Sequence, residues 1–336
     1  MEKPSLDTAK AGAMRFNTDS SQLEIYDGNQ WTGILGTSGA LQTGGTRGLI
    51  MGGIKLNPTR RHADVDFITI DTTGNGIDFG DLVQSASQGA GMGSRTRAVA
   101  GGGTPSTPAG TDNIDFHEFA SLGNFTDFGD FATAGYERIG LSNSTRGLFY
   151  GRTAGPAHTN DIDFITIAST GDAITFGDAT VNKSGSGGAG NATRAIHCGG
   201  DGPNFITCDF VTIASTGNAA DFGDLTQALG NTRGGNCGNA VRGLMTGGNL
   251  SGNIIQFVTI NTLGNSVDFG DRTVSKSQVA HMSSTTRAVF AGSGEANSQV
   301  IDYVQIMTTG NAIDFGDMTD ATNGYAAGAS NGHGGL

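Results

Sequence analysis

The segments Thr46-Arg47-Gly48-Leu49 and Asp78-Phe79-Gly80-Asp81 are the first copies of two anchors that recur six times along the 336-residue chain. The anchors keep step in a repeat of roughly 48 residues, a period typical of proteins built from one repeated supersecondary unit. The first anchor contributes Arg47, Arg97, Arg146, Arg194, Arg242 and Arg287. The second anchor contributes Phe79, Phe128, Phe176, Phe222, Phe269 and Phe315. The constant spacing predicts that all six units share one structure.

Each unit has the pattern of four short β-strands. The first strand carries the Thr-Arg anchor, the second is an apolar run such as 66–70, and the third carries Phe-Gly-Asp. Between the second and third strands lies a Gly-Asn or Gly-Asp pair, such as Gly74-Asn75, which suits the positive φ of a tight hairpin. The fourth strand is rich in glycine and alanine, as in 88–92, and only 93–95 separate it from the next first strand. We therefore expect the fourth strand to pair with the following first strand.

Six four-stranded units predict an all-β fold, a six-bladed β-propeller. The chain has no sustained 3.6-residue apolar period, which argues against a helical solenoid. Small residues in the fourth strand fit the crowded axis of such a ring. The last run, 325–330, has the pattern of a fourth strand with no first strand after it. We expect this C-terminal strand to join the first unit as its inner strand and to close the ring, which leaves few open sheet edges.

The N-terminal part differs in pattern and is expected to be separate. Residues 1–35 hold two short strands and a third with Trp31, a small β-meander in which Tyr26 and Trp31 are candidate attachment residues. Residues 36–45 form the expected linker, and the propeller is expected over 46–336. An alternative is that the meander simply caps the propeller.

Bulk properties exclude several classes of function. The net charge of −12 with only 19 Lys and Arg argues against nucleic-acid binding, which depends on cationic clusters. No apolar run approaches the ~20 residues of a membrane span, and residues 1–10 lack the apolar core of a secretion signal. Cys198, Cys208 and Cys237 form no even disulfide set or zinc motif, so all three are expected to be reduced and buried.

Apparent catalytic motifs have structural explanations. Asp-Phe-Gly occurs five times, whereas a kinase needs one copy with its partner motifs. The glycine run 185–190 precedes a strand, not the helix that a dinucleotide would need. The six histidines show no metal-ligand spacing, so neither a metal nor a cofactor is expected. A bond repeated in every unit favours a structural role for the six arginines, and a positive ring near the axis is the alternative.

Recognition is expected on one face of the ring. Strand alternation places all the loops between first and second strands on the face opposite the tight turns, and these loops vary in length. Variable loops on a fixed scaffold are where binding sites concentrate. The candidate binding residues are Arg60, Arg61, His62, His158 and Asn204. The linker enters the first unit from the tight-turn side, so we expect the N-terminal module on that side.

Two resemblances point to a source for this pattern. A glycine pair after a strand, as at 52–53, resembles the kelch arrangement. Residues 46–335 are similar to the propeller repeats in virion proteins of tailed phages that infect marine cyanobacteria. The patterns that carry this resemblance are Thr-Arg-Gly-Leu, Asp-Phe-Ile-Thr-Ile-Ala-Ser-Thr-Gly and Asp-Phe-Gly-Asp-Leu-Thr. Residues 116–119 and Thr175 depart from it, and residues 11–35 resemble short strand modules of phage fibres.

The resemblance implies a non-enzymatic virion structural protein, a tail fibre or appendage with a role in host recognition. Its partners would be other virion proteins, held through the N-terminal module, and a host surface glycan or protein, with the chain oligomeric in the particle. A capsid-surface decoration protein is one alternative. A glycan-active enzyme is another, but the expected inner strands lack the paired carboxylates that glycosidases use. A cellular kelch-like adaptor would leave the N-terminal module unexplained.

Overall fold

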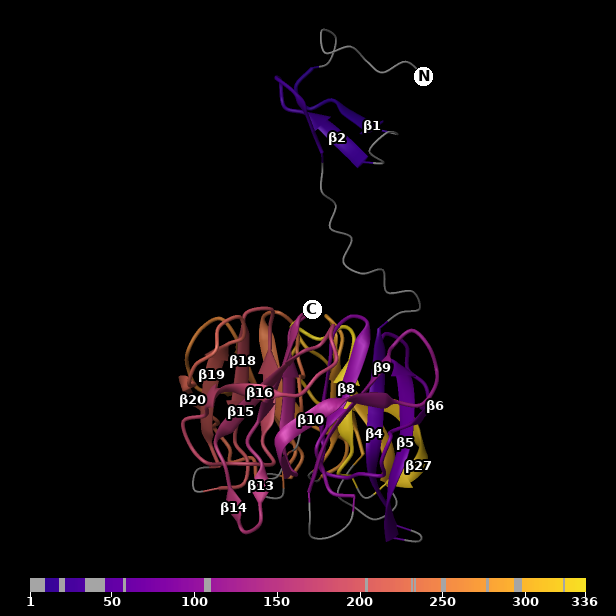
Figure 1. Ribbon diagram of the computed structural model, residues 1–336, viewed down its shortest axis with the longest axis vertical. Coiled ribbons are helices and arrows are strands. Elements are labelled where there is room, and N and C mark those ends of the chain that lie inside the picture. The colour runs from indigo at the N-terminus through magenta and orange to yellow at the C-terminus, as the bar shows by residue number, and fades with distance from the viewer. Residues whose placement is uncertain are drawn as a thin grey trace. The chain divides into compact units, whose positions relative to one another are not determined.

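A computed structural model describes residues 10–17, 22–33, 46–56, 59–105, 110–202, 205–230, 232, 234–248, 252–275, 278–292, 298–322 and 324–336. The chain divides into two compact units, residues 1–41 and 42–336. The regular elements of the described ranges are all β-strands (Figure 1), which confirms the all-β prediction. No described segment is a helix with the length and apolar character needed to span a membrane. The expected linker, 36–45, lies outside the described residues.

The first unit is a three-stranded antiparallel sheet. Its strands are β1 (Met14–Asn17), β2 (Gln22–Tyr26) and β3 (Trp31–Gly33), in the order β1-β2-β3. Tyr26 and Trp31 are register partners with ring centroids 5.4 Å apart. The Arg15 guanidinium lies 4.2 Å from the Trp31 ring and pairs with Glu24 at 2.7 Å. A cation over an indole face strengthens this small cluster.

The described part of the second unit contains six repeated antiparallel groups of strands, called sheets 1 to 6 here, of which sheets 6 and 1 are joined into one eight-stranded sheet. Sheet 1 contains β28 (Ala327–Ser330), β4 (Arg47–Leu56), β5 (Thr59–Thr69) and β6 (Ile77–Asp81). Sheet 2 contains β7 (Ala90–Gly93), β8 (Arg97–Gly101), β9 (Thr111–Glu118) and β10 (Thr126–Gly135). Sheet 3 contains β11 (Ile139–Ser142), β12 (Arg146–Tyr150), β15 (Asp161–Thr166) and β16 (Ile174–Asp178).

The remaining sheets repeat this arrangement. Sheet 4 contains β17 (Gly187–Gly190), β18 (Arg194–Cys198), β19 (Thr207–Thr212) and β20 (Ala220–Asp224). Sheet 5 contains β21 (Arg242–Thr246), β22 (Ile254–Thr259) and β23 (Val267–Asp271). Sheet 6 contains β24 (Ala280–Ser283), β25 (Arg287–Ala291), β26 (Ser298–Gln305) and β27 (Ile313–Thr322), and β27 also pairs with β4 of sheet 1. A short hairpin, β13 (Thr153–Ala154) and β14 (Ala157–His158), projects from sheet 3 (Figure 1).

Within each complete sheet the glycine-rich strand pairs with the arginine strand, as predicted from the short connection between them. The order in sheet 2, for example, is β7-β8-β9-β10. Sheet 5 departs from the pattern, because 234–239 pairs only through the bridges Gly238–Gly243 and Gly188–Asn236. A Cβ on Gly235 would lie 2.9 Å from the carbonyl oxygens of both Gly91 and Gly140. The segment therefore lies against the inner strands of sheets 2 and 3, where only glycine fits so closely.

The third strand of each sheet is bonded to the tight turn of the next sheet. Gly123 N donates to Phe79 O at 2.9 Å, and the same bond from Gly74 N to Phe315 O, at 2.9 Å, joins sheet 6 to sheet 1. The middle glycine of Phe-Gly-Asp is required here. A Cβ on Gly80, whose φ is +145°, would lie 2.2 Å from Gly123 O. Positive φ and close backbone contact together exclude other residues.

The six repeated arginines form a second series of bonds between sheets. Each Nη1 donates to the carbonyl oxygen that follows the second strand of the next sheet, at 2.6–3.1 Å. The acceptors are Phe119, Ile167, Ile213, Ile260, Ile306 and, for Arg287, Ile70 of sheet 1. Each guanidinium also lies 4.4–4.9 Å from an aromatic ring on the second strand of its own sheet. Both contacts bind the arginines within the fold.

The six phenylalanines of the second anchor are buried under those aromatic rings. Each ring meets the second-strand aromatic edge-on, with centroids 5.7–6.2 Å apart. Edge-on pairs of this kind add about 0.5–1.5 kcal/mol to the burial of the rings. Arginine, second-strand aromatic and phenylalanine thus form one stack in every sheet.

The C-terminal strand pairs with the first arginine strand, as predicted. In the register of β28 and β4, Ala327 lies opposite Met51 and Ser330 opposite Gly48. Asn331 Oδ1 then accepts the Arg47 amide at 2.7 Å. In sheet 3 the same bond is local, from the Arg146 amide to Asn143 at 2.8 Å. Sheet 1 therefore has the same asparagine-to-amide hydrogen bond as sheet 3, but its two residues come from opposite ends of the second unit's sequence.

After this turn the chain continues between strands β7 and β11 and the segment 234–239. His333 is 2% exposed, and its Nε2 lies 2.8 Å from Gly93 O. Its Nδ1 accepts from Asn236 Nδ2 at 2.7 Å. A Cβ on Gly334 would lie 2.3 Å from Asn239 O. The C-terminal residues thus lie between β7 of sheet 2 and the 236–239 segment of sheet 5.

The prediction of three reduced cysteines is wrong for two of them. Cys198 on β18 and Cys208 on β19 are register partners with Cα atoms 4.1 Å apart and are joined by a disulfide. The two cysteines are ten residues apart in the sequence, and only the register of β18 and β19 shows that their side chains are neighbours. Cys237 is free and buried, as expected.

Candidate functional site

The described candidate binding residues lie on the β4–β5 and β13–β14 hairpins, at the end of the second unit that is opposite the C-terminus, here called the loop end. The β13–β14 hairpin projects there (Figure 1). Arg60 is exposed on β5, whereas Arg61 is half-buried. Arg61 Nε donates to Ser87 Oγ at 3.0 Å and lies 3.2 Å from Thr104 Oγ1, so it reaches from sheet 1 to sheet 2. Asn204 lies outside the described residues.

His62 is buried, in contrast to the exposed role expected of a binding residue. It is 5% exposed, and neither ring nitrogen has a hydrogen-bond partner. Burial lowers the pKa of His62 to about 4, although Asp64, with Oδ1 3.8 Å from Nδ1, acts in the opposite direction. Lys55 pairs with Asp64 and, at 2.6 Å, with Asp320 of sheet 6. The base of the β4–β5 hairpin is therefore held in place by neighbouring charges.

His158 is fixed in a hydroxyl and carboxylate cluster at the junction of sheets 3 and 4. Its Nδ1 lies 2.8 Å from Ser184 Oγ, which donates to Glu137 Oε2 at 2.9 Å. Thr153 Oγ1 also donates to Glu137. Glu137 has φ +64°, a strained conformation for a residue other than glycine. The hairpin that carries His158 is thus braced against the next sheet.

Two arginines beside this cluster are already paired. Arg138 is fully buried, lies 4.1 Å from the Phe131 ring and pairs with Asp163 at 3.2 Å. Arg152 pairs with Asp161 at 3.2 Å. Burial raises the pKa of Asp163, while the Arg138 charge opposes that rise. These cations hold the loop end together and are not free for an anionic ligand.

Sheet 4 contains a Ser-His-Asp arrangement that the sequence analysis did not identify. Ser186 Oγ lies 2.5 Å from His197 Nε2, and His197 Nδ1 lies 3.3 Å from Asp209 Oδ1. Such a series can activate a serine for nucleophilic attack. All three side chains are 0% exposed, and burial lowers the pKa of His197 to about 4. The arrangement therefore has no access for a substrate and serves packing.

Asp209 belongs to a set of second-strand residues that face the junction with the preceding sheet. Each lies in register opposite the residue before the second-anchor phenylalanine, as Asp209 lies opposite Asp221. The set comprises Asp66, Asp115, Asp163, Asp209, Gln256 and Asp302. At four junctions a threonine of the preceding sheet donates to it; Thr180 Oγ1 to Asp209 Oδ2 is 2.8 Å. The repeat of Thr after Phe-Gly-Asp could have indicated this bond.

Comparisons with known proteins add no function. No protein-family model matches the chain, and no curated protein matches it. Among the residues that the structure describes, no group of three or more His, Cys, Asp or Glu is placed to hold a metal ion. The geometry itself is therefore the basis for a functional proposal.

Proposed function

We propose that the six sheets form a six-bladed β-propeller, and that the protein is a non-enzymatic binding protein of a tailed-phage particle. The bonds between sheets support the propeller, because the arginine series continues from sheet 6 back to sheet 1 through Arg287 and Ile70 O, at 3.1 Å. A closed ring leaves no large sheet edge to protect.

The observation that carries the binding role is the bracing of variable loop-end side chains against the neighbouring sheets. Arg61 is bonded to Ser87, and His158 to Ser184, each across a junction. Side chains fixed before binding lose less entropy when a ligand arrives. Two exposed groups of different character then lie on this braced scaffold: the cationic side chain of Arg60, and the uncharged hairpin tip at Gly155 and Pro156.

An enzymatic role receives no support from the chemistry of the second unit. Propeller enzymes use a hollow near the axis, whereas here His333 and the 234–238 segment lie between the inner strands. The Ser186, His197 and Asp209 side chains are fully buried. A glycan-active enzyme is therefore the weaker proposal.

The position in a virion rests on the resemblance of the repeats to phage propeller proteins. The N-terminal sheet, with Arg15 over Trp31 beside Tyr26, would attach the chain to another virion protein. A tail fibre or appendage then presents the loop end to a host surface glycan or protein.

Gold labelling of purified virions with an antibody to this chain tests the location. Label on the tail or fibres supports the appendage proposal, and label over the head supports capsid decoration instead. Adsorption of virions carrying Arg60→Glu, with the tight-turn variant Thr285→Glu as matched control, tests the loop end. Both side chains are exposed, so equal adsorption of the two variants would refute recognition through the loop end.

A further inference from the structure

The six junctions between sheets differ in how they neutralise the buried second-strand residue. Three of them supply a cation from within the chain. Arg138 lies 3.2 Å from Asp163, Lys183 3.5 Å from Asp209, and Arg272 3.0 Å from Asp302. A buried carboxylate needs such a partner, because an uncompensated charge in the interior is costly.

Among the described residues, two further junctions have no buried carboxylate that lacks hydrogen-bond donors, although neither supplies a cation. At the junction of sheets 4 and 5 the residue is the neutral Gln256, which accepts from Thr226 Oγ1 at 2.7 Å. At the junction of sheets 6 and 1, Asp66 accepts from the amide of Thr319 at 3.0 Å and from its hydroxyl at 2.7 Å. Both oxygens of Asp66 are satisfied.

Asp115, at the junction of sheets 1 and 2, has neither solution. The threonine position is Val83 here, and only its amide donates, to Oδ2 at 3.2 Å. Asp115 is 6% exposed, and its Oδ1 has no hydrogen-bond partner. Burial raises the pKa of Asp115 to about 6. The carboxylate is thus ionised at neutral pH, and its Oδ1 lacks a donor.

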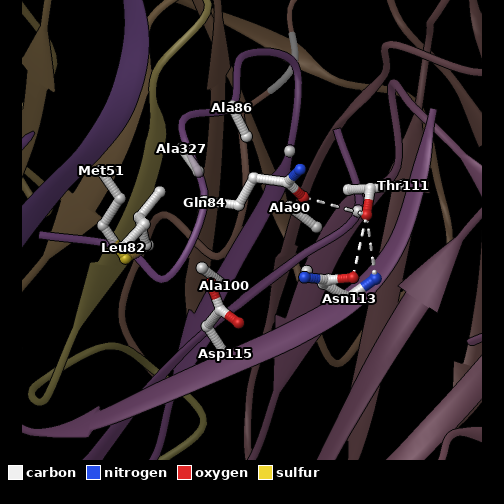
Figure 2. Close-up of a pocket in the computed structure, with 13 residues that line it drawn as sticks. Met51, Leu82, Gln84, Ala86, Ala90, Ala100, Thr111, Asn113, Asp115 and Ala327 are labelled. Carbon is white, nitrogen blue, oxygen red and sulfur yellow. Dashed lines mark hydrogen bonds between the residues drawn. The ribbon is translucent and has the colours of Figure 1, made fainter. Parts of the chain in front are cut away.

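A pocket adjoins this carboxylate. It holds about 20 Å³ of free space, room for a group the size of a water molecule or an ammonium. Figure 2 shows Asp115 between the apolar side chains of Met51 and Leu82 on one side and the polar side chains of Thr111 and Asn113 on the other. Gln84, which also lines the pocket, is exposed, so the pocket reaches the surface.

An equivalent position elsewhere in the chain holds a lysine beside the buried carboxylate. Ala86, which lines the pocket, corresponds to Lys183 at the junction of sheets 3 and 4. Each precedes a serine in a bridge, Ser87 with Thr104 and Ser184 with Asp201. Each amide also donates to the preceding sheet's loop, Ala86 to His62 O and Lys183 to Thr159 O. Alanine at this position leaves a space of about 20 Å³ at the junction of sheets 1 and 2, whereas Lys183 lies buried at the equivalent place between sheets 3 and 4.

We propose that the pocket at the junction of sheets 1 and 2 binds a primary alkylammonium group, with Asp115 Oδ1 as its acceptor. The apolar walls at Met51, Leu82 and Ala90 suit an alkyl chain, and the side-chain oxygens of Gln84 and Asn113 accept further N–H donors. The ligand is either a free amine or the lysine side chain of another protein. This site does not depend on the proposed function.

Binding is measured by titrating the isotope-labelled full chain at pH 7.5 with n-butylammonium chloride, and following the Val83 and Asn113 amides by NMR. The expected Kd is on the order of millimolar, as for other very small ligands. The uncharged n-butanol, of equal length, is the ligand control and should produce no saturable shift. Saturable shifts with sodium or potassium chloride alone would overturn the ammonium assignment in favour of a metal cation.

Three variants test the assignment. Asp115→Asn should fold, since Gln256 is tolerated at the equivalent place, and it should weaken n-butylammonium at least tenfold. Ala86→Lys should place an internal ammonium beside Asp115, abolish binding and raise Tm. Val83→Thr should restore the missing hydroxyl donor and weaken binding. Unchanged affinity in Asp115→Asn, or in Ala86→Lys with unchanged Tm, would refute the proposal.

The source of the amine is distinguished by a second ligand. Nα-acetyl-lysine methylamide that binds as tightly as n-butylammonium, while its Nε-acetylated form does not bind, indicates a lysine of a partner protein. Binding of n-butylammonium without the lysine derivative indicates a free amine. Binding of the Nε-acetylated form with equal affinity would overturn the role of the charge.

Discussion

Lowering the pH should unfold the second unit through four buried histidines. Burial lowers the pKa of His62, His197 and His333 to about 4 and that of His281 to about 3. In the unfolded chain each returns to a pKa of about 6.5. The unfolded state therefore binds more protons, and stability falls as the pH drops below 6.5 toward 4.

The magnitude follows from these pKa values. Between pH 8 and pH 5 each histidine lowers the free energy of unfolding by about 2 kcal/mol, and the four together by roughly 8 kcal/mol. Asp115, whose pKa is raised to about 6, takes up its proton at a higher pH in the folded state than in the unfolded state. It therefore stabilises the folded state by about 1 kcal/mol over this pH range and offsets that part of the loss caused by the histidines. Near pH 5.5 the net uptake is about three protons, which is a slope of roughly 4 kcal/mol per pH unit.

Urea unfolding at pH 8, 7, 6 and 5, followed by circular dichroism, measures this slope. His281→Met should reduce the uptake by about one proton, because neither ring nitrogen of His281 has a partner and a methionine of similar volume replaces it. Ile306→Val is the matched control: it removes one buried methyl group and should lower stability equally at every pH. Stability that stays constant between pH 7 and pH 5 would refute the reasoning, as would an unchanged slope in His281→Met.

Three further predictions concern the bonds between and within the sheets. Arg194→Lys should lower the free energy of unfolding by about 1–2 kcal/mol in chemical denaturation, because it loses the bond to Ile260 O and the cation–π contact of the guanidinium with Phe210; an unchanged value would contradict the arginine series. Replacing Cys198 and Cys208 together by serine should lower it by about 3 kcal/mol, the chain-entropy estimate for so short a loop, and a reductant should then have no further effect. Removing 327–336 should lower Tm and produce oligomers on size-exclusion chromatography, since the inner edge of β4 loses its partner; a monomer of unchanged Tm would contradict that role.

Much of the second unit could be predicted from the sequence because its geometry repeats. The same close approach of Gly80 to a turn occurs at every junction, so the same residues recur and the period becomes visible. The pairing of β28 with β4 followed from the run at 325–330, which lacks a following first strand. The acceptors of the arginines lie in the next unit, 64–72 residues away, or 217 residues away at Arg287. No local pattern identifies such partners.

The candidate site was less predictable because its features are exceptions to the repeat. His62 and His158 occur once each, and only the structure shows that the first is buried and the second is bonded to Ser184. The lone carboxylate of Asp115 depends on valine at 83, an ordinary substitution until its place opposite Asp115 is known. The disulfide required the register of β18 and β19. The burial of His62, the bond of His158, the unpaired Asp115 oxygen and the disulfide each depend on a contact between distant positions, which residue types alone do not reveal.

The split turn between Asn331 and Arg47 has a consequence for protein synthesis. The two residues are 284 positions apart, so the ribosome must translate nearly the whole second unit before the first sheet can be completed. Until then the nascent chain exposes the unpaired edge of β4, which is open to chaperones and to other chains. Residues 327–331 therefore decide whether sheet 1 is completed or keeps an open edge. A frameshift or early stop before residue 327 leaves β4 without β28.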